Sequence, residues 1–251
     1  MDDDMNSREI VLPFPPLPDD GKKRFVWQSA EWWEWFTAFR RKPSVTAIYR
    51  RLREYDSFVS FHSGRPVDVQ AYYKNGLQLA DVQKLNQQAR DRLLSDRAPE
   101  ITRDILEAAI AKASTYHDKT LFLVLDAREI SGHYLIYGSE HICGIAASLV
   151  RQVGFDCRQL LKHFGTPTVF RVDLSRAIIP EDQLRAWARH LREWTWESRR
   201  DPHPPCIDWS FILKQSIPAE HILDHVHPDR IPDPLLFGTI YTYRDNFPCF
   251  V

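Results

Sequence analysis

The sequence predicts an α+β domain with a split, mixed or antiparallel β-sheet and added helices. Apolar stretches of strand length and amphipathic stretches of helix length follow one another without a regular β-α-β alternation, which argues against a parallel sheet. No internal repeat is visible. With 251 residues, 43% of them hydrophobic and 27% charged, the chain is long enough for one domain with a substantial core.

The amino-terminal part predicts an arm followed by a helical annex. Residues 1–23 are acidic and then proline-rich, which is typical of an extended segment that packs on the body or on a partner. Residues 24–56 form the annex, with one helix from Ser29 to about Lys42 and a second over 45–55. The first helix carries an aromatic set that is most often found in a core or an interface: Trp32, Trp33, Trp35, Phe36 and Phe39.

Residues 57–251 are expected to form the main domain. A strand over 57–62 is followed by a turn and by a short helix over 68–74 that ends at a glycine. Residues 80–117 indicate a helical insertion in which a proline separates two helices. The remaining elements are expected as strands at 121–125, 133–137, 168–174, 208–213 and 239–243, and as helices at 139–153 and 181–196.

Three strand-end elements carry the functional hypothesis, and the first is His62. The alternation of the preceding residues places His62 at the mouth of its strand, where we expect it to be exposed. Gly64 and Pro66 force a turn directly afterwards, and Gly76 ends the helix that follows. A histidine held in this way can hydrogen-bond a ligand, while the turn offers its backbone N–H and C=O groups.

The second and third elements are a tyrosine and a carboxylate. Tyr137-Gly138-Ser139 ends the expected strand at 133–137, and a tyrosine there can present its ring to a flat heterocycle. Asp208 places one carboxylate near the start of an aromatic-rich strand.

In this order the three elements resemble the His–Tyr–acid motifs of ADP-ribosyltransferases of the diphtheria-toxin and poly(ADP-ribose) polymerase type. The resemblance covers residues 57–79 and 121–224, and the helices at 80–117 are an addition to it. It implies the ADP-ribosyltransferase fold, NAD as the substrate, and cleavage of the nicotinamide–ribose bond with transfer of ADP-ribose to a macromolecule.

The resemblance also implies roles for the residues of the first element. His62 would hydrogen-bond the adenosine-side ribose of NAD, and the backbone of Ser63 and Gly64 would hold the nicotinamide amide. Arg65 would meet the pyrophosphate, because a guanidinium presents a fork of donors that matches phosphate.

In the other two elements, Tyr137 would stack on the nicotinamide ring, with Tyr134 as the alternative and Ser139 in the same cofactor-binding set. Asp208 would bond a hydroxyl of the nicotinamide ribose. Its carboxylate would stabilise the positive charge that develops on the ribose as nicotinamide leaves.

Two positions depart from the family pattern. Ser63 stands where many members have glycine directly after the histidine, and Gly64 follows one residue later. Asp208 replaces the usual glutamate and is one methylene shorter, so Glu220 and Glu140 are alternative acids.

The acceptor of ADP-ribose stays open between a protein side chain and a base of a nucleic acid. No Glu-x-Glu pair lies near Asp208 to indicate arginine as the target, and the net charge of -1 gives no electrostatic argument for nucleic acid. The resemblance implies an intracellular toxin with a neutralising antitoxin protein as partner, or an effector of antiviral (anti-phage) defence.

Two other functions remain as alternatives. An NAD glycohydrolase would differ from a transferase only in using water as the acceptor. A non-catalytic interaction module would use the eight tryptophans and the proline-rich arm as a partner surface. A shared cleft for His62, Tyr137 and Asp208 would favour the enzyme, and a wide separation would favour the module.

Several other classes of protein find little support in the sequence. No apolar run approaches the length of a membrane span, so no membrane partner and a cytoplasmic location are expected. The four cysteines contain no C-x-x-C pair. His221 and His225 are spaced like helical metal ligands and His227 follows, but the H-E-x-x-H motif is absent and prolines bracket the segment, so no metal is expected.

Overall fold

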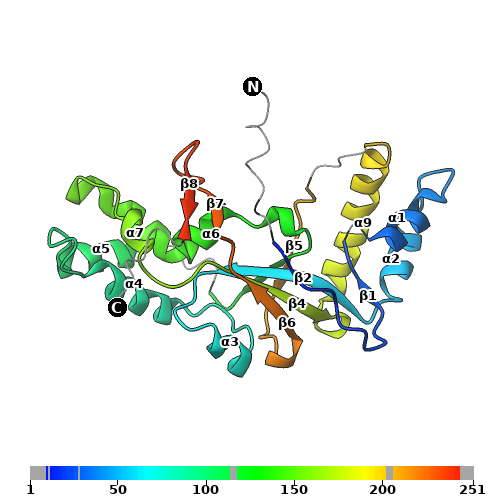
Figure 1. The fold of residues 1–251 in the computed structure, drawn as a ribbon, viewed down its shortest axis with the longest axis horizontal. Helices are drawn as coiled ribbons and strands as arrows, with labels where there is room; N and C mark the ends of the chain where they lie inside the picture. Colours follow the sequence, from blue (N-terminus) through cyan, green and yellow to red (C-terminus); the bar gives the residue numbers. More distant parts are fainter. Residues whose placement is uncertain (1–9, 11, 28, 114–117, 202–205, 244–251) are drawn as a thin grey trace.

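The computed structural model describes residues 10, 12–27, 29–113, 118–201 and 206–243. These residues form an α+β fold around a mostly antiparallel six-stranded sheet, shown edge-on at the centre of Figure 1. The short strand β1 (Arg24–Phe25) runs parallel to β2 at one side of this path. The other strands have the order β5 (Ser210–Leu213), β3 (Leu121–Val124), β2 (Ser57–Gly64), β4 (Thr168–Ser175) and β6 (Ile222–Val226).

The sheet is split beside its central strand. β2 and β4 pair along eight residues, from Ser57 opposite Ser175 to Gly64 opposite Thr168. In contrast, the ladder between β2 and β3 consists of the single pair Phe61–Val124. The edge of β2 that faces β3 is therefore without a ladder partner beyond Phe61 in the described part of the chain.

One core, rich in aromatic residues, lies on one side of the sheet. Helices α1 (Ala30–Thr37), α2 (Val45–Leu52) and α9 (Glu181–Ser198) gather there, at the right of Figure 1. The hydroxyl of Ser29 caps α1 as the sequence predicts. This first core contains Phe58 and Phe170 from the sheet. Seven of the eight tryptophans belong to it or pack against it: Trp27, Trp32, Trp35, Trp187, Trp194, Trp196 and Trp209.

A second core occupies the opposite end of the molecule. It is built from α4 (Val82–Leu93), α5 (Arg103–Lys112), α6 (Gly132–Tyr137), α7 (Glu140–Val153) and α8 (Arg158–Leu161), at the left of Figure 1. The expected insertion at 80–117 is confirmed as helical: α4 and α5 both pack on α7, and residues 114–117 lie outside the described ranges.

The strand expected at 133–137 is wrong, because this segment forms helix α6. The Ser131 hydroxyl accepts from the backbone N–H of His133 and so caps the helix, and Gly138 ends it with φ of 78°. A short apolar run between two glycines has no periodicity that separates a strand from one buried helical turn. Leu135, Ile136 and Tyr137 all face the second core.

The remaining elements close the ends of the sheet. The short helix α3 (Gln70–Asn75) follows β2 and ends at Gly76, as predicted. Three short helical turns adjoin the strands. η1 (Ala127–Glu129) follows β3, η2 (Arg176–Ile178) follows β4, and η3 (Ala219–His221) precedes β6. β7 (Arg230–Pro232) and β8 (Ile240–Thr242) form a hairpin, of which β7 contacts α6.

The proline-rich arm packs on the body of the molecule along its described part. The centroids of the Phe14 and Phe61 rings are 5.5 Å apart. The Cζ atom of the Arg171 guanidinium lies 5.0 Å from the centroid of the Phe14 ring. None of the described helices is long and apolar enough to cross a membrane.

Candidate functional site

His62 lies inside β2 and not at its end, which corrects the expectation of an exposed residue at a strand mouth. β2 continues through Ser63 and Gly64, because both residues pair with β4. The side chain is only partly exposed, and its Nδ1 lies 3.1 Å from the carbonyl oxygen of Phe122 on β3. A carbonyl can only accept, so Nδ1 carries the proton and Nε2 of the neutral ring is an acceptor.

Burial keeps the His62 imidazole neutral. Loss of water around the ring lowers the pKa of His62 below its usual value of 6.5, and the bond to Phe122 opposes this only in part. Within the described residues, Nε2 has no hydrogen-bond partner. The site therefore offers one fixed, uncharged hydrogen-bond acceptor beside the split in the sheet.

Helix α3 covers the row of side chains to which His62 belongs. His62 is opposite Phe170, and Phe170 is opposite His225 on β6. The Tyr72 ring stacks on Phe170 with 4.4 Å between centroids, and the Tyr73 hydroxyl lies 2.7 Å from Nδ1 of His225. The two tyrosines of α3 thus tie this helix to the His62 side of the sheet.

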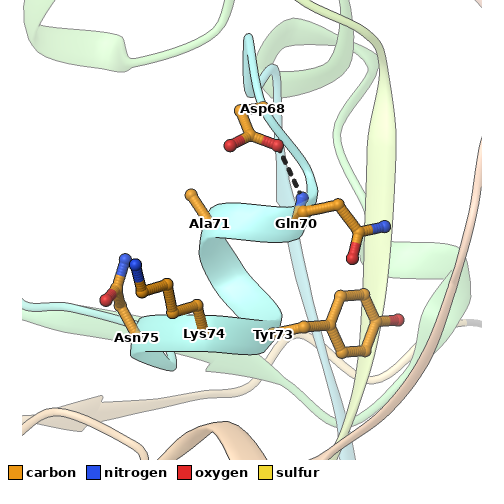
Figure 2. Close-up of a pocket in the computed structure, with 6 residues that line it drawn as sticks. All are labelled: Asp68, Gln70, Ala71, Tyr73, Lys74 and Asn75. Carbon is orange, nitrogen blue, oxygen red and sulfur yellow. Dashed lines mark hydrogen bonds between the residues drawn. The ribbon is translucent and has the colours of Figure 1, made fainter.

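An open pocket of about 500 Å³ lies along α3. Its lining is polar, and Figure 2 shows Tyr73 at one side of the helix and Lys74 and Asn75 at its end. The Asp68 carboxylate accepts from the backbone N–H of Gln70 and fixes the start of the helix. The two central residues of the expected site, His62 and Tyr137, are not among the residues that line this pocket.

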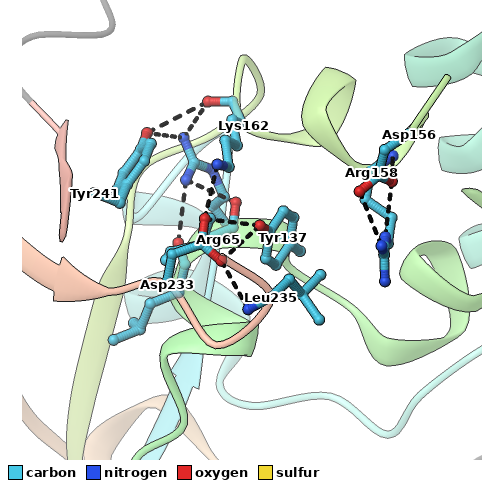
Figure 3. Close-up of polar contacts among 10 residues, drawn as sticks. Arg65, Tyr137, Asp156, Arg158, Lys162, Asp233, Leu235 and Tyr241 are labelled. Carbon is cyan, nitrogen blue, oxygen red and sulfur yellow. Dashed lines mark hydrogen bonds and ion pairs between the residues drawn. The ribbon is translucent and has the colours of Figure 1, made fainter. Parts of the chain in front are cut away.

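Arg65 does not face a ligand. Its side chain is 5% exposed, and all five guanidinium N–H donors are used within the molecule. The acceptors are the carbonyl oxygens of Leu135, Ile136, Lys162 and Phe164 and the hydroxyl of Tyr241, at 2.6 to 3.1 Å. Figure 3 shows this guanidinium bonded to two of them, Lys162 and Tyr241. Since no donor is left for a ligand, the expected contact with a pyrophosphate is wrong.

Tyr137 is buried in the second core and is not available to stack on a nicotinamide ring beside His62. Its hydroxyl donates to the carboxylate of Asp233 at 2.8 Å, and the Lys162 ammonium donates to the same group at 2.8 Å (Figure 3). Burial favours a neutral Asp233, but Lys162 and Tyr137 outweigh it and hold the pKa of Asp233 below its usual range. Burial and this carboxylate raise the pKa of Tyr137.

Tyr134 and Ser139 flank Tyr137 in the chain. Tyr134 is the more exposed tyrosine, and its hydroxyl donates to Glu140 at 3.1 Å. Ser139 precedes α7 but makes no side-chain bond that caps this helix.

Asp208 lies apart from His62. It is exposed and precedes β5. Because β3 lies between β5 and β2 in the sheet, β5 is about 10 Å from the strand that carries His62. Its charge acts instead on His190 and Glu129. The structure therefore does not bring His62, Tyr137 and Asp208 into one cleft, and the expected triad is not assembled from these three residues.

Sequence reasoning missed the residues that share the row of His62 on the sheet or cover that row. Tyr72 and Tyr73 stand within the recognised first element, where their aromatic character was the available signal. His225 was considered only as a metal ligand, and no group of His, Cys, Asp or Glu among the described residues is arranged to hold a metal ion.

Arg92 of α4 was also missed, because nothing in the local pattern distinguishes it from the basic residues around it. It is 9% exposed, and its charge is felt at the hydroxyl of Tyr72.

Comparison with known proteins found no matching family model, no matching curated protein and no matching solved structure.

Proposed function

We propose that this chain is an NAD-dependent ADP-ribosyltransferase whose substrate binds at His62. The observation that carries the proposal is the strand–turn–helix–glycine unit from β2 to Gly76, in which the Phe122 carbonyl fixes the His62 ring and leaves Nε2 as a neutral acceptor. An acceptor in this position suits a ribose hydroxyl, which can donate to it. The resemblance of the unit to the family supplies the assignment of NAD.

The split in the sheet supports an approach of the nicotinamide amide to the backbone of β2. Beyond Phe61, the edge of β2 toward β3 has no ladder partner among the described residues. A Cβ built on Gly64 would meet no atom within 4 Å, so the space beside this residue is open. Backbone groups of Ser63 or Gly64 could therefore hold a carboxamide, as they do in the family.

The acid of the site is reassigned in this proposal. Glu140 follows the α6–α7 turn, while Glu220 belongs to η3, which packs on α3. Either carboxylate would act as nicotinamide leaves with the electron pair of the broken C–N bond, when positive charge develops on the ribose. An acceptor nucleophile on a protein or nucleic acid then forms the new bond to the ribose carbon.

The test measures nicotinamide release from NAD by the purified chain, with and without cell lysate as a source of acceptor. We expect His62→Gln and one of the variants Glu140→Gln and Glu220→Gln to lose activity about 100-fold or more, because the proposal relies on one group to bind the ribose and on the other to stabilise its developing charge. Asp208→Asn is the matched acid control and His190→Gln the matched histidine control, and both should keep full activity.

The outcomes separate the candidate functions. Release that needs lysate indicates transfer to a macromolecule, and release without lysate indicates an NAD glycohydrolase. Absence of release and of NAD binding under both conditions would contradict the proposal. Loss in Asp208→Asn but in neither glutamate variant would restore the acid that the sequence alone favours.

The interaction module is less well supported than the enzyme, although the expected triad is dispersed. Seven of the eight tryptophans that would form its surface belong to the first core or pack against it, and the exposed large hydrophobic residues in the described ranges contain no tryptophan. The predicted helix at 29–42 is shorter, α1 (Ala30–Thr37), and its residues Trp32, Trp35 and Phe36 contribute to the interior and not to a partner surface.

A further inference from the structure

Positive charge concentrates on one side of the molecule, along helices α2 and α9. Residues 40–53, which contain α2 and the segment before it, hold six arginine or lysine residues and no aspartate or glutamate, in a chain with a net charge of -1. α9 adds further arginines, among them Arg185, Arg189 and Arg192. The near-neutral total therefore conceals a strongly basic region.

Contacts between the two helices bring these arginines together. The Arg185 guanidinium lies over the Tyr49 ring of α2, with 4.3 Å from Cζ to the ring centroid, and Arg53 approaches the same ring at 5.8 Å. Two turns further along α9, Arg192 donates to the carbonyl oxygen of Pro43, which directly precedes the cap of α2. α2 and α9 therefore run side by side in opposite directions, at the right of Figure 1.

Helical spacing adds two more arginines to the line along which α2 and α9 meet. Arg189 follows Arg185 by four residues and precedes Arg192 by three, so the three side chains share one face of α9, the face that contacts α2. Arg50 and Arg53 share a face of α2 for the same reason. We call the surface formed by these five arginines the α2–α9 seam.

Most of the positive charge on the α2–α9 seam is not neutralised within the molecule. Arg185 and Arg192 each form an ion pair with a glutamate of α9. Arg50, Arg53 and Arg189 are exposed, and no carboxylate of the described residues pairs with them. Several uncompensated charges of one sign on one surface create a potential that attracts anions.

We infer that the α2–α9 seam binds the phosphate backbone of a nucleic acid. Two neighbouring rows of guanidinium groups suit a chain of phosphates, because each group can donate two N–H bonds to one phosphate. A docked protein or a membrane surface would require exposed apolar side chains at the seam. None of the exposed large hydrophobic residues in the described ranges belongs to α2 or α9. The inference goes beyond the proposed function and does not depend on it.

The test measures, by fluorescence anisotropy over a series of salt concentrations, the binding of the purified chain to a labelled DNA duplex of about 20 base pairs and to the RNA strand of the same sequence. The wild type should bind the duplex with a dissociation constant on the order of 10⁻⁶–10⁻⁴ M at physiological salt. A variant that combines Arg50→Gln, Arg53→Gln and Arg189→Gln should bind at least about tenfold more weakly at low salt. The slope of log K against log salt should also become shallower by about 2.7, since each phosphate contact contributes about 0.9.

The matched control combines Arg97→Gln, Arg103→Gln and Arg151→Gln. These arginines are also exposed and without a paired carboxylate among the described residues, but they lie near the helices of the second core. The control changes the net charge by the same amount and should keep the wild-type affinity and slope. Both triple variants should keep the thermal midpoint of unfolding, because exposed positions contribute little to stability. If the seam triple does not fold, Arg189→Glu against Arg151→Glu repeats the comparison with single changes.

Three outcomes would overturn the inference. The first is no binding of either nucleic acid by the wild type at low salt, and the second is an equal loss of affinity in both triple variants. The third is tighter binding to poly-glutamate or to phosphatidylserine vesicles than to the duplex, which would assign the seam to an acidic protein or to a membrane. Because no NAD enters the experiment, its result is independent of the test of the proposed function.

Discussion

Two arginines, Arg65 and Arg92, are buried near each other but have opposite surroundings. Arg65 has an acceptor for each of its five donors, supplied by α6, by the segment at 162–164 and by the carboxyl-terminal hairpin. Arg92 has one long bond to its own helix. Burial is similar in the two cases. The number of satisfied donors, and not burial, therefore distinguishes the arginine that holds the fold together.

The same comparison explains why Arg65, which the sequence predicts to bind a pyrophosphate, has no donor left to do so. Arg65 follows His62 and Gly64 in the expected turn, but its guanidinium bonds three segments of the molecule, which are α6, the segment at 162–164 and the carboxyl-terminal hairpin. Arg92 lies in an insertion that the family resemblance does not cover. The predictions below test this contrast, from the largest expected effect to the smallest.

Arg65→Ala should produce the largest effect. It removes the guanidinium that donates to four carbonyl oxygens and to the Tyr241 hydroxyl, and each buried group that is left unpaired costs about 1–3 kcal/mol. We expect the free energy of unfolding, measured by urea denaturation, to fall by about 4 kcal/mol or more. Arg158→Ala, which removes an arginine that is paired only with its neighbour Asp156, should cost less than about 1 kcal/mol. Similar losses in the two variants would contradict the structural role of Arg65.

Asp233→Asn should have the next largest effect, because it removes the anion between Lys162 and Tyr137. We expect a loss of about 2–3 kcal/mol in the same urea experiment, since the Lys162 ammonium is left buried without its counter-ion. Tyr137→Phe should cost only about 1 kcal/mol. If Tyr137→Phe instead abolished nicotinamide release from a stable protein, Tyr137 would have to reach the substrate after all.

Stability should fall in mild acid, because burial lowers the pKa of His62, His133 and His190 below 6.5. Below pH 6.5 these histidines bind protons in the unfolded chain but not yet in the folded chain. The stability present above this pH is therefore lost as the pH falls toward the lowered pKa values. Each histidine contributes a slope of at most about 1.4 kcal/mol per pH unit. Urea denaturation between pH 7.5 and 5 measures the slope, which His62→Gln should reduce. An unchanged slope in His62→Gln would contradict the assignment.

Arg92→Met should have the smallest effect on unfolding, between no change and a gain of about 1 kcal/mol. The opposite signs for the two arginines, a large loss for Arg65 and none for Arg92, are the sharpest test of the comparison. A loss above about 2 kcal/mol at Arg92 would make the two residues alike.

Local patterns in the sequence predicted much of the fold. The insertion at 80–117, helix α3 with its stop at Gly76, and strand β4 were all readable, because the periodicity of apolar residues and glycine stops are local signals. The helix α6 was missed because six residues are too few for periodicity to decide its type.

The candidate site was predicted less well, since its contacts are distant in the chain. The partner of Tyr137 is 96 residues away, and Tyr241 is 176 residues from Arg65. A strand-end tyrosine and a turn arginine look exposed when only their neighbours are considered. A local sequence pattern does not indicate that a carboxylate or a hydroxyl from a distant part of the chain will bond such a residue.

The bond between Arg65 and Tyr241 also bears on the order in which the protein is made. At about 5–20 residues per second, a ribosome needs roughly 10–35 s to add the 176 residues that separate the two partners. During this time β2 and the turn after it are already synthesised, but the guanidinium still lacks one of its acceptors. The segment around His62, although encoded in the first third of the chain, therefore reaches its final form only when the last hairpin has emerged.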